Sequence, residues 1–150
     1  MKKIISFSFF LLTISLAFGQ QLDPVKWSQK VLKISDTDYD LVFTANIEDG
    51  WYVYSQYLES DDGPIRTSFN FNSNDNLEFI GKTTETGNKK EGFDEMFEMN
   101  LVKFGGEVTF VQRIRTKTKP AAVSGYLEFM TCDNERCLPP MEVNFTLDLN

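Results

Sequence analysis

Apolar and polar residues alternate with a period of two along most of the chain. The clearest run is residues 141–149, in which every second side chain is apolar. Residues 41–47 repeat the pattern and lead through the turn residues 48–50 into residues 51–54. Because successive side chains of a strand point to opposite faces, this alternation indicates strands with one face on a core and one in water. Further strands are predicted at residues 27–34, 65–71, 77–82, 99–104, 108–114 and 127–129.

These eight or nine short strands, with turn signals at intervals of about ten residues, predict an all-β antiparallel sandwich. Neither an internal repeat nor an interdomain linker interrupts them, so residues 20–150 are predicted to form one domain. The least strand-like segment is residues 83–95, which contains Gly87, Gly92 and two adjacent lysines. We expect this segment to be a long, polar, mobile loop, and such loops in compact β domains often carry function.

The first 19 residues have the features of a signal peptide. Lys2 and Lys3 form a charged start, residues 4–18 are mostly apolar, and a small-x-small cleavage site precedes Gln20. The apolar stretch contains four hydroxyl side chains and is too short for a good membrane span. We therefore expect an exported, periplasmic monomer with no membrane insertion after cleavage, in a compartment where disulfides form.

Composition removes several classes of function. The chain has no histidine, which excludes Ser-His-Asp and Cys-His catalysis and the commonest zinc and copper sites. Its net charge is −7, or −9 once Lys2 and Lys3 are removed with the signal peptide. Such an acidic chain argues against binding to nucleic acid or to anionic membrane surfaces. We expect neither a metal nor a cofactor.

Three groups of residues have both a functional and a structural interpretation. The run Asp36-x-Asp38-x-Asp40 resembles the start of a calcium loop, but leucine stands where that loop needs glycine, so we interpret it as a solvated turn. Asp94 and Glu95 have the residue types of a glycosidase pair, although surface acids are the default in so acidic a chain. Four methionines suggest a soft-metal site, but methionine in a β core is more commonly filler: Met96, Met99, Met130 and Met141.

Cys132 and Cys137 are the only cysteines, and four residues separate them. In the chain-entropy model so small a ring stabilises by about 2 kcal/mol, against about 4 kcal/mol for a ring spanning half a domain. A lone pair on a turn suits a reversible dithiol, since it can open and close without dismantling the core. The alternative is a local clip that stiffens a hairpin. The spacing alone leaves both interpretations open.

Four segments of the chain resemble the amino-terminal periplasmic domain of the thiol:disulfide interchange protein DsbD family. They are Gly50-Trp-Tyr-Val-Tyr-Ser55, Asp62-Gly-Pro-Ile-Arg-Thr-Ser-Phe69, Asp94-Glu-Met-Phe97 with the Val-Thr-Phe-Val-Gln strand after it, and Cys132-x4-Cys137-Leu-Pro-Pro140. The last segment is the most specific. The resemblance implies an immunoglobulin-like sandwich with the cysteines on a turn between two late strands.

The resemblance also implies residue roles. Cys132 and Cys137 match the redox pair, with Cys137 forming the mixed disulfides. Asp94, Glu95, Met96 and Phe97 match a cap loop whose aromatic side chain lies over the disulfide until a partner displaces it. Tyr52 and Tyr54 match tyrosines that border the site. From the residues themselves, Arg136 should favour a Cys137 thiolate, while Asp133 and Glu135 oppose it.

The implied function is that of a shuttle, a component of a protein-disulfide reductase. A membrane thiol-disulfide reductase passes electrons to this domain, which reduces thioredoxin-fold periplasmic proteins such as disulfide isomerases and cytochrome c maturation thioredoxins. The cysteines are one residue closer than in the best-known members, and we expect no membrane unit after Asn150. We therefore expect a free-standing shuttle with a separately encoded reductase. The alternative is an exported binding module with a purely structural disulfide.

Overall fold

The computed structural model describes residues 22–118 and 122–149, and this part of the chain is built from strands without a helix. The predicted signal peptide lies outside these residues. Within them, no helix exists that is long and apolar enough to cross a membrane. The strands are β1 (Val25–Lys33), β2 (Asp38–Ile47), β3 (Tyr52–Tyr54), β4 (Ser68–Phe71), β5 (Leu77–Asp94), β6 (Met99–Thr116), β7 (Ala122–Phe129), β8 (Thr131–Cys132) and β9 (Met141–Asp148).

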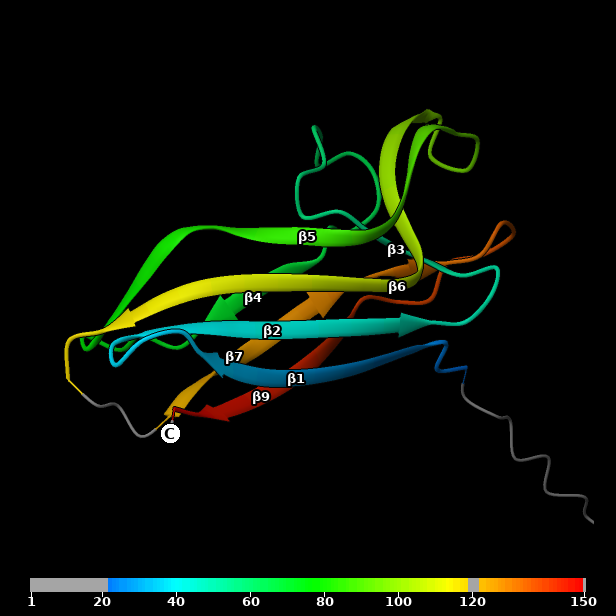
Figure 1. Cartoon of the computed structure of the whole chain (residues 1–150). Coiled ribbons are helices and arrows are strands. Elements are labelled where there is room, and N and C mark those ends of the chain that lie inside the picture. Colours follow the sequence, from blue (N-terminus) through cyan, green and yellow to red (C-terminus); the bar gives the residue numbers. More distant parts are fainter. Residues whose placement is uncertain (1–21, 119–121, 150) are drawn as a thin grey trace, which may run out of the picture.

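The strands form two antiparallel sheets that lie face to face (Figure 1). The larger sheet has the order β1-β2-β6-β3-β8, and β5 pairs with the other edge of β6. The smaller sheet has the order β4-β7-β9. All pairings are antiparallel, which confirms the antiparallel sandwich expected from the alternation of apolar and polar residues.

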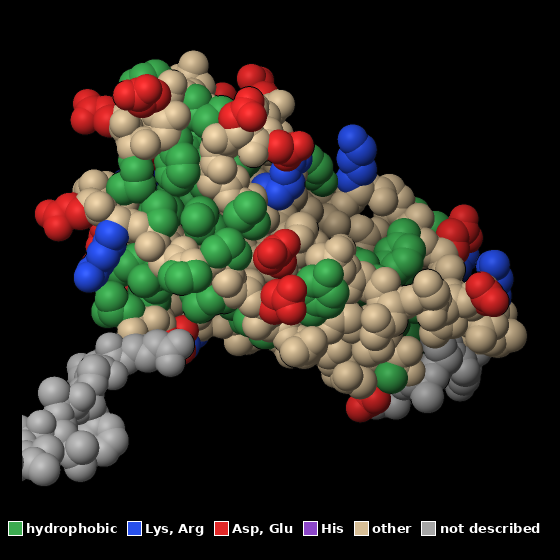
Figure 2. All heavy atoms as spheres, turned by 180° about the vertical axis from the view of Figure 1, so that it is seen from behind, with side chains coloured by type: hydrophobic (Ala, Val, Ile, Leu, Met, Phe, Trp, Pro, Cys, Tyr) green, Lys and Arg blue, Asp and Glu red, His purple; other side chains and the backbone are tan. Residues whose placement is uncertain are grey.

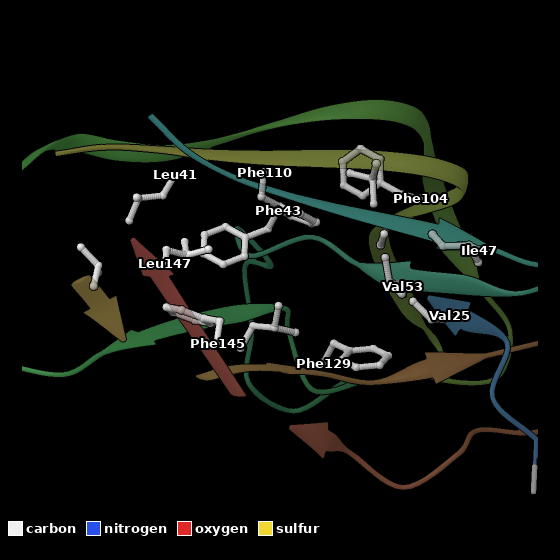
Figure 3. Packing of buried hydrophobic residues seen from close by; sticks show 14 of the residues in the cluster. Val25, Leu41, Phe43, Ile47, Val53, Phe104, Phe110, Phe129, Phe145 and Leu147 are labelled. Atoms are coloured by element: carbon white, nitrogen blue, oxygen red, sulfur yellow. The ribbon is translucent and has the colours of Figure 1, made fainter. Parts of the chain in front are cut away.

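The main core fills the space between the two sheets and is rich in aromatic rings (Figure 3). Phe43 of the larger sheet lies 4.9 Å, centroid to centroid, from Phe145 of the smaller sheet, and Phe110 packs 5.3 Å from Phe69. Such tilted and edge-on contacts add to the hydrophobic burial of the rings. The buried members of this core are Val25, Tyr39, Leu41, Phe43, Ala45, Ile47, Trp51, Val53, Phe104, Val108, Phe110, Ile114, Val123, Leu127, Phe129, Phe145, Leu147 and Leu149.

The prediction of a mobile loop at residues 83–95 is wrong, because residues 77–94 form one long strand, β5, which pairs with β6. The predicted strands at residues 99–104 and 108–114 are likewise parts of the single strand β6. The alternation fails in β5 because the outer half of this strand extends beyond the smaller sheet (Figure 1). Both of its faces meet water there, so polar residues are tolerated on both.

Glycines bend this long hairpin. The register shifts where Gly87 pairs with Val108 and Asn88 pairs with Gly105, and Gly106 adopts a φ of 72°. A Cβ atom on Gly87 would lie 2.5 Å from the carbonyl oxygen of Glu107, so this close approach requires glycine. The bend turns the tip of the hairpin upward at one end of the sandwich (Figure 1). We call residues 95–98, which connect β5 to β6, the hairpin tip.

Two aspartates of the calcium-like run, Asp38 and Asp40, form ion pairs across the sheet. Asp40 accepts two hydrogen bonds from Arg113 of β6, at 2.6 and 2.7 Å, and Asp38 accepts one from Arg115 at 2.7 Å. These ion pairs are exposed, so each contributes little to stability.

Candidate functional site

The two cysteines form a disulfide at the end of the sandwich that carries the hairpin tip. Cys132 ends β8 and lies opposite Tyr52 of β3, and the Cα atoms of the two cysteines are 4.0 Å apart. The turn between them is held by its own groups. The Asp133 carboxylate accepts hydrogen bonds from the backbone N–H groups of Glu135 and Arg136, both at 2.8 Å. The hydrogen bond from the Glu135 N–H has the larger effect and the one from the Arg136 N–H the smaller, and both hold the pKa of Asp133 below its usual range.

The two sulfur-bearing residues differ in exposure. Cys132 is 1% exposed and belongs to a small group of residues that we call the disulfide cluster. Cys137 is only partly buried. A reagent or protein thiol therefore has access to Cys137 first. The disulfide cluster consists of the buried Tyr54, Leu58, Leu101 and Cys132, with Phe97, Met99, Met130 and Cys137 packed against them.

The hairpin tip covers the disulfide with a methionine. The Sδ atom of Met96 lies 3.4 Å from the Sγ atom of Cys137. The ring of Phe97 packs edge-on against Tyr54, with centroids 5.8 Å apart, and lies against the buried group that includes Cys132. Met96 and Phe97 of the predicted cap loop therefore both lie at the disulfide cluster, and Met96 makes a direct sulfur contact. Displacement of this cap by a partner stays a prediction. Methionine suits this place because its sulfur is polarizable and its side chain adapts to irregular surfaces.

Asp94 fixes the tip to the sheet. One carboxylate oxygen accepts hydrogen bonds from the backbone N–H groups of Met96, at 3.0 Å, and Phe97, at 3.4 Å. The other accepts a 2.6 Å bond from the ammonium group of Lys103. Burial of the Asp94 side chain, which is 9% exposed, works to raise its pKa, but the bond and charge of Lys103 and the two N–H donors outweigh burial and lower the pKa. Asp94 is thus a charged anchor for the tip.

The ring of Tyr52 contacts two lysines that the sequence did not single out. The ammonium groups of Lys90 and Lys103 lie 4.7 and 4.6 Å from the centre of its ring, and Lys90 donates a 2.9 Å hydrogen bond to its hydroxyl. Lys90 and Lys103 are direct partners across β5 and β6, where like charges repel. The tyrosine ring and Asp94 offset this repulsion. Predicting the pairing of β5 with β6 would have revealed both lysines.

The other predicted residues lie around this centre. The guanidinium of Arg136 is 5.8 Å from the ring centre of Trp51, and its Nε atom is 3.4 Å from the Asp133 carboxylate. Glu95 is exposed and borders a hollow of about 310 Å³, together with Tyr54, Asp94, Met96, Lys103 and Asn134 among others. Burial, and then the charge of Asp94, raise the pKa of Tyr54. A thiolate-favouring role of Arg136 stays a prediction.

Three of the four methionines discussed above gather here. Met96, Met99 and Met130 all contact the disulfide cluster, while Met141 packs on the main core. Met99 fills space next to Gly63, where a Cβ atom would lie 2.7 Å from its sulfur. Within residues 22–118 and 122–149 no group of three or more His, Cys, Asp or Glu side chains is arranged to hold a metal.

The fold and the site define a class of protein: an immunoglobulin-like β-sandwich with a single, partly covered disulfide on a turn at one end. Residues 21–149 match the family described as thiol:disulfide interchange protein DsbD, N-terminal, and the chain belongs to this family. The membership confirms the resemblance noted in the sequence. Together with the Cys132–Cys137 disulfide, it supports thiol–disulfide exchange as the general activity.

Solved structures agree on the fold. The chain is similar to the amino-terminal domain of DsbD from Neisseria meningitidis in its reduced form, with 20% identity, a TM-score of 0.53 and coverage of 81% of this chain and 85% of that one. It is also similar to the amino-terminal periplasmic domain of ScsB from Proteus mirabilis, with 17% identity and a TM-score of 0.56. That match covers 83% of this chain and 45% of the ScsB chain. No curated protein sequence matches the chain.

Proposed function

We propose that this protein is a periplasmic thiol–disulfide shuttle, which carries reducing equivalents from a membrane reductase to oxidised thioredoxin-fold proteins. One observation carries the proposal: the disulfide joins a buried sulfur-bearing residue, Cys132, to an accessible one, Cys137, under the tip of a hairpin. A shuttle needs one sulfur to exchange with partners and a second that stays within the domain to resolve the mixed disulfide.

The exchange would begin from the disulfide form. A donor thiolate attacks the Sγ atom of Cys137, a mixed disulfide forms between donor and Cys137, and Cys132 leaves as a thiolate. The second thiol of the donor then releases Cys137, so the donor is oxidised and the domain holds two thiols. In the second half, the Cys137 thiolate attacks the disulfide of an oxidised partner. Cys132 resolves that mixed disulfide, which leaves the partner reduced and the domain oxidised.

The hairpin tip would control these steps. In the closed state Met96 lies on Cys137 and shields it from small oxidants and reductants. A docking partner would displace Met96 and replace its apolar contact with its own surface. Figure 2 shows apolar side chains gathered at this end of the molecule, with acidic side chains around them. Asp94 would set how easily the tip opens, because it joins the backbone of the tip to Lys103.

The proposal includes export by residues 1–19 and a single domain at residues 20–150 that acts as a monomer without a cofactor. Location in the periplasm is supported by the signal-like sequence and by the family.

The competing function is an exported binding module in which the disulfide is only structural. A glutathione titration separates the two. The reduction potential of a structural disulfide is below about −300 mV, and the reduction potential of a shuttle disulfide should be well above this value. We expect free thiols to appear at physiological glutathione ratios. A pair that stays oxidised at every such ratio excludes the shuttle.

Trapping tests the assignment of the exchanging sulfur. The Cys132→Ser variant keeps the accessible Cys137 and should form stable mixed disulfides with thioredoxin-fold partners. The Cys137→Ser variant is the matched control and should not, because Cys132 is buried. Trapping by the control alone would reverse the assignment.

A further inference from the structure

Met96 combines exposure with a contact to the disulfide. The residue as a whole is 41% exposed, and its sulfur lies 3.4 Å from the Sγ atom of Cys137. The contact leaves much of the residue open to water. Met96 therefore lies at the surface, where small oxidants in solution can approach it, and is also part of the cover of the site.

The other methionines of the described part of the chain are less accessible. Met99, Met130 and Met141 are all partly buried. Met99 also packs closely over Gly63, and Met141 is packed on the main core. Because oxidation of methionine follows exposure of its sulfur, these differences single out Met96.

We propose that Met96 is a site of oxidation by peroxides or hypohalous acids, and that its sulfoxide opens the cover over the disulfide. With hydrogen peroxide the step is a two-electron oxygen transfer. The thioether sulfur gains one oxygen atom and becomes a sulfoxide, and the peroxide is reduced to water. The Cys132–Cys137 disulfide is not changed in this step, so the modification acts on access to the disulfide.

The physical reason lies in the polarity of the sulfoxide. The closed tip is held partly by the apolar contact of the Met96 thioether with the disulfide. Oxidation adds a strong hydrogen-bond acceptor to that sulfur, and an acceptor placed against a disulfide without a donor loses its hydration. The modified side chain is better solvated away from Cys137. Asp94 still holds the backbone of the tip, so the sandwich stays folded.

This inference goes beyond the shuttle, because it concerns access to the disulfide by any thiol. In a shuttle, it would speed disulfide exchange when oxidants are abundant. A small reductant tests it without any protein partner. Its failure is thereby distinguishable from failure of the shuttle, which the glutathione titration and trapping experiments test.

The experiment uses the mature chain with its disulfide formed. Limited hydrogen peroxide is added and then removed, and peptide mass spectrometry measures sulfoxide at each methionine. The rate at which dithiothreitol opens the disulfide is then followed by trapping free thiols. Met96→Leu keeps an apolar cover that cannot be oxidised, and Met99→Leu is the matched control within the same cluster. Each variant is compared with its own untreated sample.

We expect Met96 to be oxidised before the other three methionines. The opening rate should rise several-fold after treatment in the natural chain and in Met99→Leu, and should stay unchanged in Met96→Leu. Met96→Gln, a polar substitute for the sulfoxide, should open faster without any treatment. The proposal is overturned if Met96 is not the first methionine oxidised, if its oxidation leaves the rate unchanged, or if treated Met96→Leu accelerates equally.

Discussion

The main core and the disulfide cluster are built from neighbouring residues of the same strands, yet they are sealed in different ways. On β3, Val53 points into the main core and Tyr54 into the disulfide cluster, as alternation requires. Two sheets close over the main core, so Phe43 and Phe110 are completely buried. A single hairpin tip covers the disulfide cluster, and Met96 of this tip is exposed.

This difference indicates how the candidate site could open without unfolding of the domain. Opening the disulfide cluster exposes the side chains of one hairpin tip, whereas opening the main core would separate two sheets. The cysteines lie on a turn that is held by its own hydrogen bonds, centred on Asp133. Their local ring can therefore open while the main core keeps its packing.

The largest effect should come from the main core. Phe110→Ala removes a fully buried ring that contacts Trp27 and Phe69, and we expect it to lower the free energy of unfolding by about 3–5 kcal/mol. Chemical denaturation measures this change. If Phe110→Ala lowered the free energy of unfolding by less than removal of the disulfide does, the main core would not be the more important region for stability.

Loss of the disulfide should cost less. The double variant Cys132→Ser, Cys137→Ser is expected to lower the free energy of unfolding by about 2 kcal/mol, because the closed ring is short. Denaturation of the double variant and of the natural chain under oxidising conditions measures it. A variant that no longer folds would show that the disulfide is structural.

Truncation of the hairpin tip should affect access more than stability. Met96→Ala and Phe97→Ala each remove part of the cover and should lower the free energy of unfolding by about 1 kcal/mol or less, since Met96 is exposed and Phe97 is only partly buried. Dithiothreitol should open the disulfide several-fold faster in Met96→Ala, which loses the direct sulfur contact, and by less in Phe97→Ala.

Two results would argue against this account of the tip. Unchanged opening rates in both variants would mean that the tip does not shield the disulfide. Unfolding of Phe97→Ala would mean that Phe97 is an ordinary core residue. Phe93→Ala is a suitable control, because this side chain lies on the same hairpin and is 66% exposed.

The smallest effect should be the dependence of the tip on pH. The folded state lowers the pKa of Asp94 from its ordinary value of 3.8, so its charge stabilises the closed tip above that pH. This stabilisation is lost as the pH falls through the lowered pKa. A phosphine reductant, which works in acid, should open the disulfide faster as the pH falls below about 4. At each pH, the rate for the protein disulfide is divided by the rate at which the same phosphine reduces glutathione disulfide, which corrects for the effect of pH on the reductant itself.

Asp94→Asn provides the control for this effect. The variant lacks the carboxylate that binds Lys103, so its relative rate should be high already at neutral pH and should not change in acid. Circular dichroism at each pH shows whether the sandwich is still folded. An equal acid response in the variant would assign the effect to another group.

Much of the fold could be predicted from the sequence, and the incorrect predictions all concern the long hairpin of β5 and β6. Residues 41–47 and 141–149 lie between a core and water, so their alternation shows directly that they are strands. Residues 83–95 form the outer part of a hairpin with water on both faces, and the alternation is lost. The sequence pattern therefore does not predict the pairing of β5 with β6, nor the position of Lys90 and Lys103 beside Tyr52.

The sequence by itself determined the all-β antiparallel class and indicated the cysteine pair as the centre of the candidate site. These features depend on local alternation and on residue type, which neighbours in sequence carry. Only the tertiary structure decided that Met96 contacts Cys137 while Phe97 packs on Tyr54, and that Lys103 holds Asp94. These contacts depend on a glycine bend and on a register between distant strands, which a linear pattern does not encode.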